Sequence, residues 1–143
     1  MCATFETAGN QHRPGRLIPI WRANRFERVL WGGFARSEKL SWWRSKGCLP
    51  VDVPANRFAE RSHRDGRLHW GDLPEGQVIR GLWDSSGPIP QVLIVTRPAT
   101  ASELEAFGHD RMPLVEPPLY SSLPLGPEAE TENEPGPKQM ELF

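Results

Sequence analysis

The sequence predicts an α+β fold that is mainly β, with a mixed, partly antiparallel sheet and few helices. Short runs of β-branched and aromatic residues separated by Gly, Pro and charged residues indicate strands, and one segment carries both helix start and stop signals. The 143 residues suffice for one domain with a substantial core. We expect one folded domain at residues 1–116 and a disordered tail at residues 117–143.

Four apolar runs are the predicted strands. In chain order they are RLIPIW, ERVLW, QVIRGLW and PQVLIVT, which begin at Arg16, Glu27, Gln77 and Pro90. The last run leads into the predicted helix. There Thr100 and Glu103 form a capping-box pattern, and Gly108 suits the left-handed position after the helix. His109 is therefore expected directly after a helix end.

The C-terminal segment from Pro117 is rich in Pro, Glu and Gly and has almost no apolar periodicity, which predicts disorder. The chain has no run of 18 apolar residues and no apolar stretch typical of a signal peptide. We expect a cytoplasmic monomer without a membrane partner. Its two cysteines, Cys2 and Cys48, show no spacing typical of disulfide frameworks or zinc sites, so we expect no metal and no cofactor.

Charge is distributed unevenly along the chain. Residues 1–70 carry 13 Lys and Arg against 6 Asp and Glu, whereas residues 71–143 carry 4 against 12. The basic half also contains five tryptophans. Arginines with interleaved aromatic rings suit single-stranded nucleic acid, which offers phosphates and stackable bases. The alternative interpretation is a basic surface over an aromatic core.

Cys2 offers unusual chemistry if Met1 is removed. Its α-amine and thiol would then form a 1,2-aminothiol, which converts an aldehyde into a stable five-membered thiazolidine. An internal cysteine forms only a reversible hemithioacetal. The α-amine titrates near neutrality, with a reference pKa of about 7.7 to 8.0, so it needs little tuning to act as a nucleophile.

A series of short motifs follows Cys2. The most specific is His109-Asp110-Arg111-Met112-Pro113. The weaker ones are Trp31-Gly32, Ala35-Arg36-Ser37-Glu38, Cys48-Leu49-Pro50, Phe58-Ala59-Glu60 and Gly81-Leu82-Trp83. In this order, and with Met1-Cys2, they resemble the signature of the SRAP family, the SOS response-associated peptidase-like proteins that shield abasic sites in single-stranded DNA. The resemblance covers nearly all of residues 1–116.

The resemblance implies an SRAP-like fold and covalent capture of abasic sites in the DNA damage response. A ring-opened abasic site is an aldehyde, and Cys2 would trap it as a thiazolidine. The implied proton-transfer residues are Glu60 and His109, with His109 as the acid at the sugar oxygen because its ordinary pKa is close to neutral pH. The peptidase label of the family implies a linked thiol-dependent peptidase or autopeptidase activity.

Two alignments of the family's N-A-R-x-E motif are open. The first uses Phe34 to Glu38, which puts Phe34 where the family has Asn. The second uses Asn56 to Glu60, which supplies an Asn but removes the catalytic role of Glu60. We prefer the first alignment because it keeps Arg36 in register. The chain is also shortened between Trp31 and Glu60 relative to the family, and Ala3 replaces the usual Gly.

Four further residues are predicted to bind DNA. Arg36 and Arg111 lie within the matching motifs, and we expect them to bind phosphates by bidentate contacts. Trp42 and Trp43 offer rings on which bases can stack. The alternative is that one of the two tryptophans fills the core.

The last residues, QMELF, provide a separate signal. They resemble the peptide by which bacterial replication and repair proteins dock onto the DNA sliding clamp. In this interpretation Leu142 and Phe143 fill an apolar pocket and Gln139 bonds its rim, while the tail sets the reach. Such docking would bring the protein to the nucleoid or the replication fork.

Three functional hypotheses result. The first is a protein that binds single-stranded DNA and crosslinks itself to abasic sites through Cys2. The second is a catalytically degenerate module that binds DNA and the clamp, which Phe34 and the shortened chain favour. The third is an N-terminal-nucleophile amidohydrolase, in which Cys2 attacks an amide.

Overall fold

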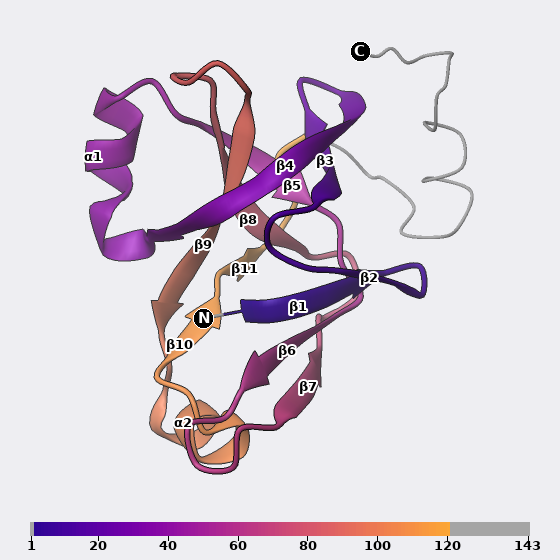
Figure 1. Cartoon of the computed structure of the whole chain (residues 1–143), viewed down its shortest axis with the longest axis vertical. Coiled ribbons are helices and arrows are strands. Elements are labelled where there is room, and N and C mark those ends of the chain that lie inside the picture. The colour runs from indigo at the N-terminus through magenta and orange to yellow at the C-terminus, as the bar shows by residue number, and fades with distance from the viewer. Residues whose placement is uncertain (1, 121–143) are drawn as a thin grey trace.

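Five strands close into a barrel in the computed structural model, which describes residues 2–120 and only the backbone of Cys2 (Figure 1). They are β3 (Leu17–Arg22), β4 (Arg25–Arg36), β5 (Leu49–Val53), β8 (Val78–Asp84) and β9 (Gln91–Pro98). The order is β9-β4-β3-β5-β8, and β8 pairs with β9 to complete the ring. Strands β4 and β9 are parallel, and the other pairs in the ring are antiparallel. The mixed sheet and the four predicted strands are confirmed.

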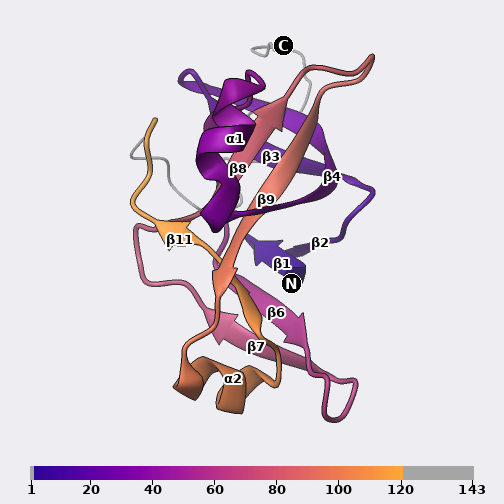
Figure 2. The ribbon, with the colours of Figure 1, turned by 90° about the vertical axis from the view of Figure 1, so that its left-hand side faces the viewer.

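A second sheet, which the sequence analysis did not predict, lies below the barrel (Figure 2). It has the antiparallel order β2-β1-β6-β7. Its strands are β1 (Cys2–Thr7), β2 (Asn10–His12), β6 (Arg57–Arg61) and β7 (Leu68–Asp72). Two short strands extend the barrel sheet: β10 (Arg111–Pro113) pairs with β9, and β11 (Val115–Glu116) pairs with β8.

The main apolar core fills the barrel and continues into the second sheet. Inside the barrel it contains β-branched side chains such as Ile18, Val51 and Ile94, and Phe5 and Phe58 extend it into the second sheet. Burial of these side chains stabilises the fold by about 25 cal/mol per Å² of apolar surface. The two sheets therefore share one core.

The glycine of the Gly-Leu-Trp motif has a packing role in this core. A Cβ atom at Gly81 would lie 2.9 Å from a methyl group of Val53 and 2.9 Å from one of Val92. Real Cβ atoms do not approach carbon this closely, so only glycine fits between the two valines.

The predicted helix is confirmed as α2 (Ala101–Phe107). Thr100 accepts a hydrogen bond from the Glu103 backbone N–H, and the Glu103 side chain accepts one from the Thr100 N–H, which completes the capping box. Gly108 ends the helix with a φ of 68° in the left-handed region. His109 thus follows the helix end directly, as expected.

A second helix, α1 (Leu40–Ser45), follows the 3₁₀ turn η1 (Ser37–Lys39) and was not predicted. It packs on the outside of the barrel, where Leu40 and Trp43 lie against a smaller buried cluster that contains Cys48, Leu82 and Val95. A short helix without a side-chain cap gives little sequence signal, which explains why it was missed.

The described chain continues for four residues beyond the expected domain boundary at residue 116. The backbone N–H groups of Leu119 and Tyr120 donate to the carboxylate of Asp52 on β5. The predicted disordered tail from residue 121 onward, with Gln139, Leu142 and Phe143, lies outside the described residues. No helix in the described part of the chain is long and apolar enough to cross a membrane.

Candidate functional site

Cys2 begins β1, and its backbone pairs with that of Glu60 on β6. The next pair in the register is Thr4 with Ala59, so Ala3 forms a β-bulge between the two pairs. A bulge bends its strand and redirects the neighbouring residues, and bulges are common beside active sites. The register therefore places the amino-terminal end of β1 beside Glu60.

Glu60 is a fully buried carboxyl group. It lies on β6, which has β1 on one side and β7 on the other in the second sheet. Burial raises the pKa of Glu60 to about 7, although the positive charge of the chain's amino terminus opposes the shift. A carboxyl group with this pKa exchanges protons readily at neutral pH.

His109 is held by its own loop. Its Nδ1 accepts a hydrogen bond from the backbone N–H of Arg111 at 3.1 Å, so the neutral ring carries its proton on Nε2. Burial is the main cause that lowers the pKa of His109, and the amino-terminal charge and His63 lower it further. The loop and the burial thus favour the neutral ring with its proton on Nε2.

The β6–β7 hairpin brings a second imidazole to His109. The backbone N–H of His63 donates to the carbonyl of Gly108 at 2.7 Å, and the rings of His63 and His109 lie 4.3 Å apart, centroid to centroid. Gly108 also packs tightly there, because a Cβ at this position would collide with the side chain of Ser62. The end of α2 and the hairpin of Glu60 therefore form one corner, which we call the Cys2 corner, at the start of β1 (Figure 1).

An ion pair joins the His109–Pro113 motif to the weaker motif that ends at Glu38. The Arg111 guanidinium donates to both carboxylate oxygens of Glu38, at 2.7 and 2.9 Å, and also to Thr96. Hydrogen bonding to Arg111 is the main cause that lowers the pKa of Glu38 to about 2. Arg111 is buried and already engaged, so it fixes η1 against β9. Its role in phosphate binding stays a prediction.

The two predicted stacking tryptophans have different environments. Trp43 packs on the outer cluster, whereas Trp42 is 50% exposed, and their rings meet edge to face at 4.8 Å. The ammonium group of Lys46 lies 5.4 Å from the centre of the Trp42 ring. One tryptophan of the pair therefore serves the core, and the other is available to a ligand.

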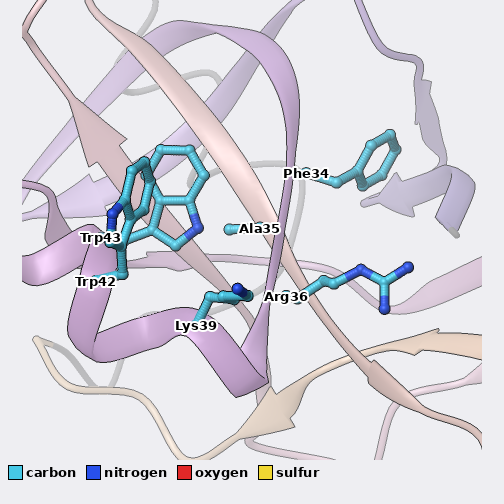
Figure 3. Close-up of a pocket in the computed structure, with 6 residues that line it drawn as sticks. All are labelled: Phe34, Ala35, Arg36, Lys39, Trp42 and Trp43. Atoms are coloured by element: carbon cyan, nitrogen blue, oxygen red, sulfur yellow. The ribbon is translucent and has the colours of Figure 1, made fainter.

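A hollow of about 380 Å³ lies where β4 meets α1. It is lined by Phe34, Ala35, Arg36, Lys39, Trp42 and Trp43 (Figure 3). Figure 3 also shows that Phe34 and Arg36 extend to one side of β4, while the tryptophans lie on the other side. Arg36 is exposed, but it points away from the tryptophans with which the sequence grouped it.

The two alternative alignments place either Phe34 or Asn56 at the family's Asn position, and both side chains make contacts within the fold. Phe34 packs edge to face on Trp31 at 5.8 Å and offers no hydrogen bond. The Asn56 side chain accepts the backbone N–H of Ala8 at 2.7 Å and so holds the β1–β2 turn. The choice between the two alignments stays a prediction.

No protein-family model matches the chain, and no curated protein matches it. A crystal structure of a Bordetella bronchiseptica protein, determined as a structural genomics target, has a similar fold. The TM-score is 0.53 at 18% sequence identity, and the match covers 78% of this chain and 73% of that one. This similarity shows a shared fold alone.

Sequence reasoning missed two residues of this region. Glu38 was recognised as part of a motif but not as the partner of Arg111, since nothing in the sequence shows that residues 73 positions apart are neighbours. His63 has no motif around it, and only the hairpin register brings it to His109. Among the described side chains, no group of three His, Cys, Asp or Glu residues is arranged to hold a metal ion.

Proposed function

We propose that this chain is an SRAP-like protein that binds single-stranded DNA and forms a covalent thiazolidine crosslink to abasic sites through Cys2. The observation that carries the proposal is the pairing of Cys2 with Glu60, a buried carboxyl group whose pKa is about 7. His109 lies in the same corner. A nucleophile, a proton-transfer carboxyl group and a hydrogen-bond donor would thus meet at one place.

The proposed reaction starts with opening of the sugar ring. The C1′ hydroxyl gives its proton to the Glu60 carboxylate and O4′ takes a proton from Glu60 as the C1′–O4′ bond breaks, which yields the aldehyde. The neutral His109 ring donates an Nε2–H hydrogen bond to O4′ and so stabilises the charge that develops there. The neutral Cys2 amine then adds to C1′. Glu60 accepts a proton from the nitrogen and returns it to the hydroxyl, which leaves as water. Addition of the Cys2 sulfur to the resulting imine carbon closes the thiazolidine, so one water is lost in total.

The DNA would lie across the hollow at α1. The exposed face of Trp42 suits an unpaired base, and such stacking contributes about 1 to 3 kcal/mol per base. Lys39 and Lys46 supply positive charge around it. Arg36 lies on the other side of β4, where it would contact the DNA strand beyond the hollow. A linked thiol-dependent peptidase activity of Cys2 belongs to the same proposal.

The test is the intact mass of the protein after incubation with a single-stranded oligonucleotide that contains one abasic site. We expect an adduct at the mass of the protein without Met1, plus the oligonucleotide, minus one water. Cys2→Ser should abolish this adduct. Cys48→Ser is the matched control and should retain it, because Cys48 is buried and burial raises the pKa of its thiol. An adduct that still forms in the Cys2→Ser variant would contradict the proposal.

A second candidate is a non-catalytic module that binds DNA and the sliding clamp. The observation that favours it is Phe34, whose ring packs on Trp31 where an active family member would offer an amide. This candidate predicts DNA binding without any adduct, even when removal of Met1 has been verified by mass.

A further inference from the structure

His63 lies beside His109, but neither the sequence analysis nor the proposed reaction gives it a role. The two histidines come from different elements, His63 from the β6–β7 hairpin and His109 from the loop after α2. The hairpin and α2 lie at the same end of the molecule (Figures 1 and 2). The ring centroids are 4.3 Å apart, with an angle of 49° between the ring planes. The two imidazole rings are therefore in contact.

The backbone of both segments fixes this contact. The N–H of His63 donates to the carbonyl of Gly108, the residue before His109, at 2.7 Å. The Ser62 side chain fills the space that a Cβ at Gly108 would need, so the two segments pack closely. The Arg64 guanidinium donates to two carbonyls in the last turn of α2, at 3.3 and 2.6 Å. The fold thus places the His63 ring against that of His109.

The two rings differ in how well they can hold a proton. His63 is exposed, so water can solvate a charge on its ring. The His109 side chain is only 12% exposed. Its Nδ1 accepts the backbone N–H of Arg111, and a proton on Nδ1 would remove this hydrogen bond. A single proton taken up by the pair is therefore held more favourably on His63.

The charged groups around His109 act in the same direction on balance. Burial is the main cause that lowers the pKa of His109, and the positive charges of the amino terminus at β1 and of His63 lower it further. Asp110, on the same loop, opposes this shift, but its side chain is 74% exposed and lies 3.5 Å from Nδ1. Glu60 on β6 has a pKa of about 7 and so carries little negative charge in mildly acidic solution.

We propose that His63 is a positioning residue for the crosslinking reaction, because it takes up the proton of the imidazole pair in mildly acidic solution and its charge then keeps His109 neutral. The neutral His109 ring keeps the hydrogen bond from Arg111, which orients Nε2–H towards the sugar oxygen of the substrate. This inference rests on the proposed function, since His63 acts on the reaction only through His109.

The first measurement is the titration of His109 in the full chain, followed by its Cε1 proton resonance in NMR spectra and assigned by comparison with His109→Gln. His63→Gln removes the neighbouring charge. It should raise the midpoint of His109 by about 0.7 pH unit, the value for two unit charges about 4 Å apart in water. His63→Arg keeps a positive charge and should leave the midpoint at or below that of the unmodified protein. Arg67→Gln is the matched control, because it removes a charge from the same exposed hairpin and should leave the midpoint unchanged.

The second measurement is the rate of adduct formation with the abasic-site oligonucleotide as a function of pH. At about pH 8 the His109 ring is neutral with or without His63, so His63→Gln and the unmodified protein should react at equal rates. In mildly acidic solution the variant should react more slowly, by up to about fivefold, the ratio that corresponds to 0.7 pH unit. A loss of the same size at every pH would indicate a structural role alone and would contradict the inference.

Failure of this inference can be distinguished from failure of the proposed function. An unchanged His109 midpoint in His63→Gln, with the adduct still formed, would overturn the role of His63 and leave the proposed function. A raised midpoint in His63→Arg, or an equal rise in Arg67→Gln, would also overturn it, because the effect would not come from the charge at residue 63. No adduct from the unmodified protein at any pH, with removal of Met1 verified by mass, would overturn both.

Discussion

At the scale of single residues, Glu60 is the most unusual group in the described chain. A carboxylate that is fully removed from water is costly, and proteins commonly respond by keeping the group protonated. Burial raises the pKa of Glu60 from 4.5 to about 7, so the folded protein holds a proton that the unfolded chain releases between these two values. The stability of the fold and the proton affinity of Glu60 are therefore linked.

The sign of this linkage gives the first prediction. Between pH 4.5 and 7 the folded state binds more protons at Glu60 than the unfolded state, so the contribution of Glu60 to stability falls as pH rises through this range. Glu60→Gln removes the ionisation, so the variant should gain stability relative to the unmodified protein, by about 2 to 3 kcal/mol across the range. Urea unfolding of both proteins at matched pH values measures the difference. A difference that does not vary with pH would contradict the pKa assignment.

Motifs at this scale could be read from the sequence only in part. The sequence predicts that Cys2, Glu60 and His109 share one site. The pairing of β1 with β6 places the backbone of Cys2 beside that of Glu60. The sequence left open that one of the two tryptophans fills the core, but it did not show which one. Trp43 packs on the outer cluster and Trp42 is exposed, and this difference depends on the orientation of the helix.

At the scale of elements, α2 determines where His109 lies. The capping box at Thr100 and the left-handed Gly108 define both ends of the helix, and the ion pair of Arg97 with Glu103, at 2.6 Å, attaches its first turn to β9. A helix of seven residues has little stability of its own, so these local contacts decide whether it forms.

Loss of the cap should therefore be measurable. Thr100→Ala removes the side chain that accepts the Glu103 N–H, and we expect the free energy of unfolding to fall by about 1 kcal/mol. Glu105→Ala, in the same helix, is the control, because this exposed residue has no capping role and the change should stay within about 0.5 kcal/mol. Chemical denaturation of the three proteins tests the expectation, and equal effects of the two changes would contradict it.

Elements differed in how well the sequence predicted them. The barrel strands β8 and β9 are mostly apolar because most of their side chains are buried on both faces, and such runs are conspicuous in a sequence. Strands β1, β6 and β7 combine polar and apolar residues, and β6 even buries its Glu60, so no simple alternation marks them. The second sheet was missed for this reason, although it carries most of the candidate site.

At the scale of the whole molecule, a buried ion pair connects the barrel to the last described residues. Asp52 is fully buried and accepts from the Arg80 guanidinium at 2.7 Å, and it also accepts the N–H groups of Leu119 and Tyr120. The carbonyl of Pro117 receives a further hydrogen bond from Arg80. Hydrogen bonds to the Asp52 carboxylate thus connect β5 with β8 and with residues 119–120.

Removal of the Asp52 charge should lower the stability of the fold. Asp52→Asn leaves the buried Arg80 with the half-exposed Glu116 as its remaining counter-charge, and we expect a loss of about 3 kcal/mol in the free energy of unfolding. Asp72→Asn is the matched control, since the Asp72 side chain is 85% exposed and its replacement should cost less than about 0.5 kcal/mol. The two variants can be compared by urea denaturation, and similar losses would argue against a special role for Asp52.

The anchoring of residues 117 to 120 at Asp52 has a consequence for anything attached beyond them. The last described residues lie on β5 and β8, well away from the start of β1 in both views (Figures 1 and 2). A molecule held by the C-terminal segment would therefore leave the Cys2 corner accessible. Binding at the C-terminal segment and binding at the Cys2 corner would then strengthen each other, because the first contact raises the local concentration of the domain for the second contact.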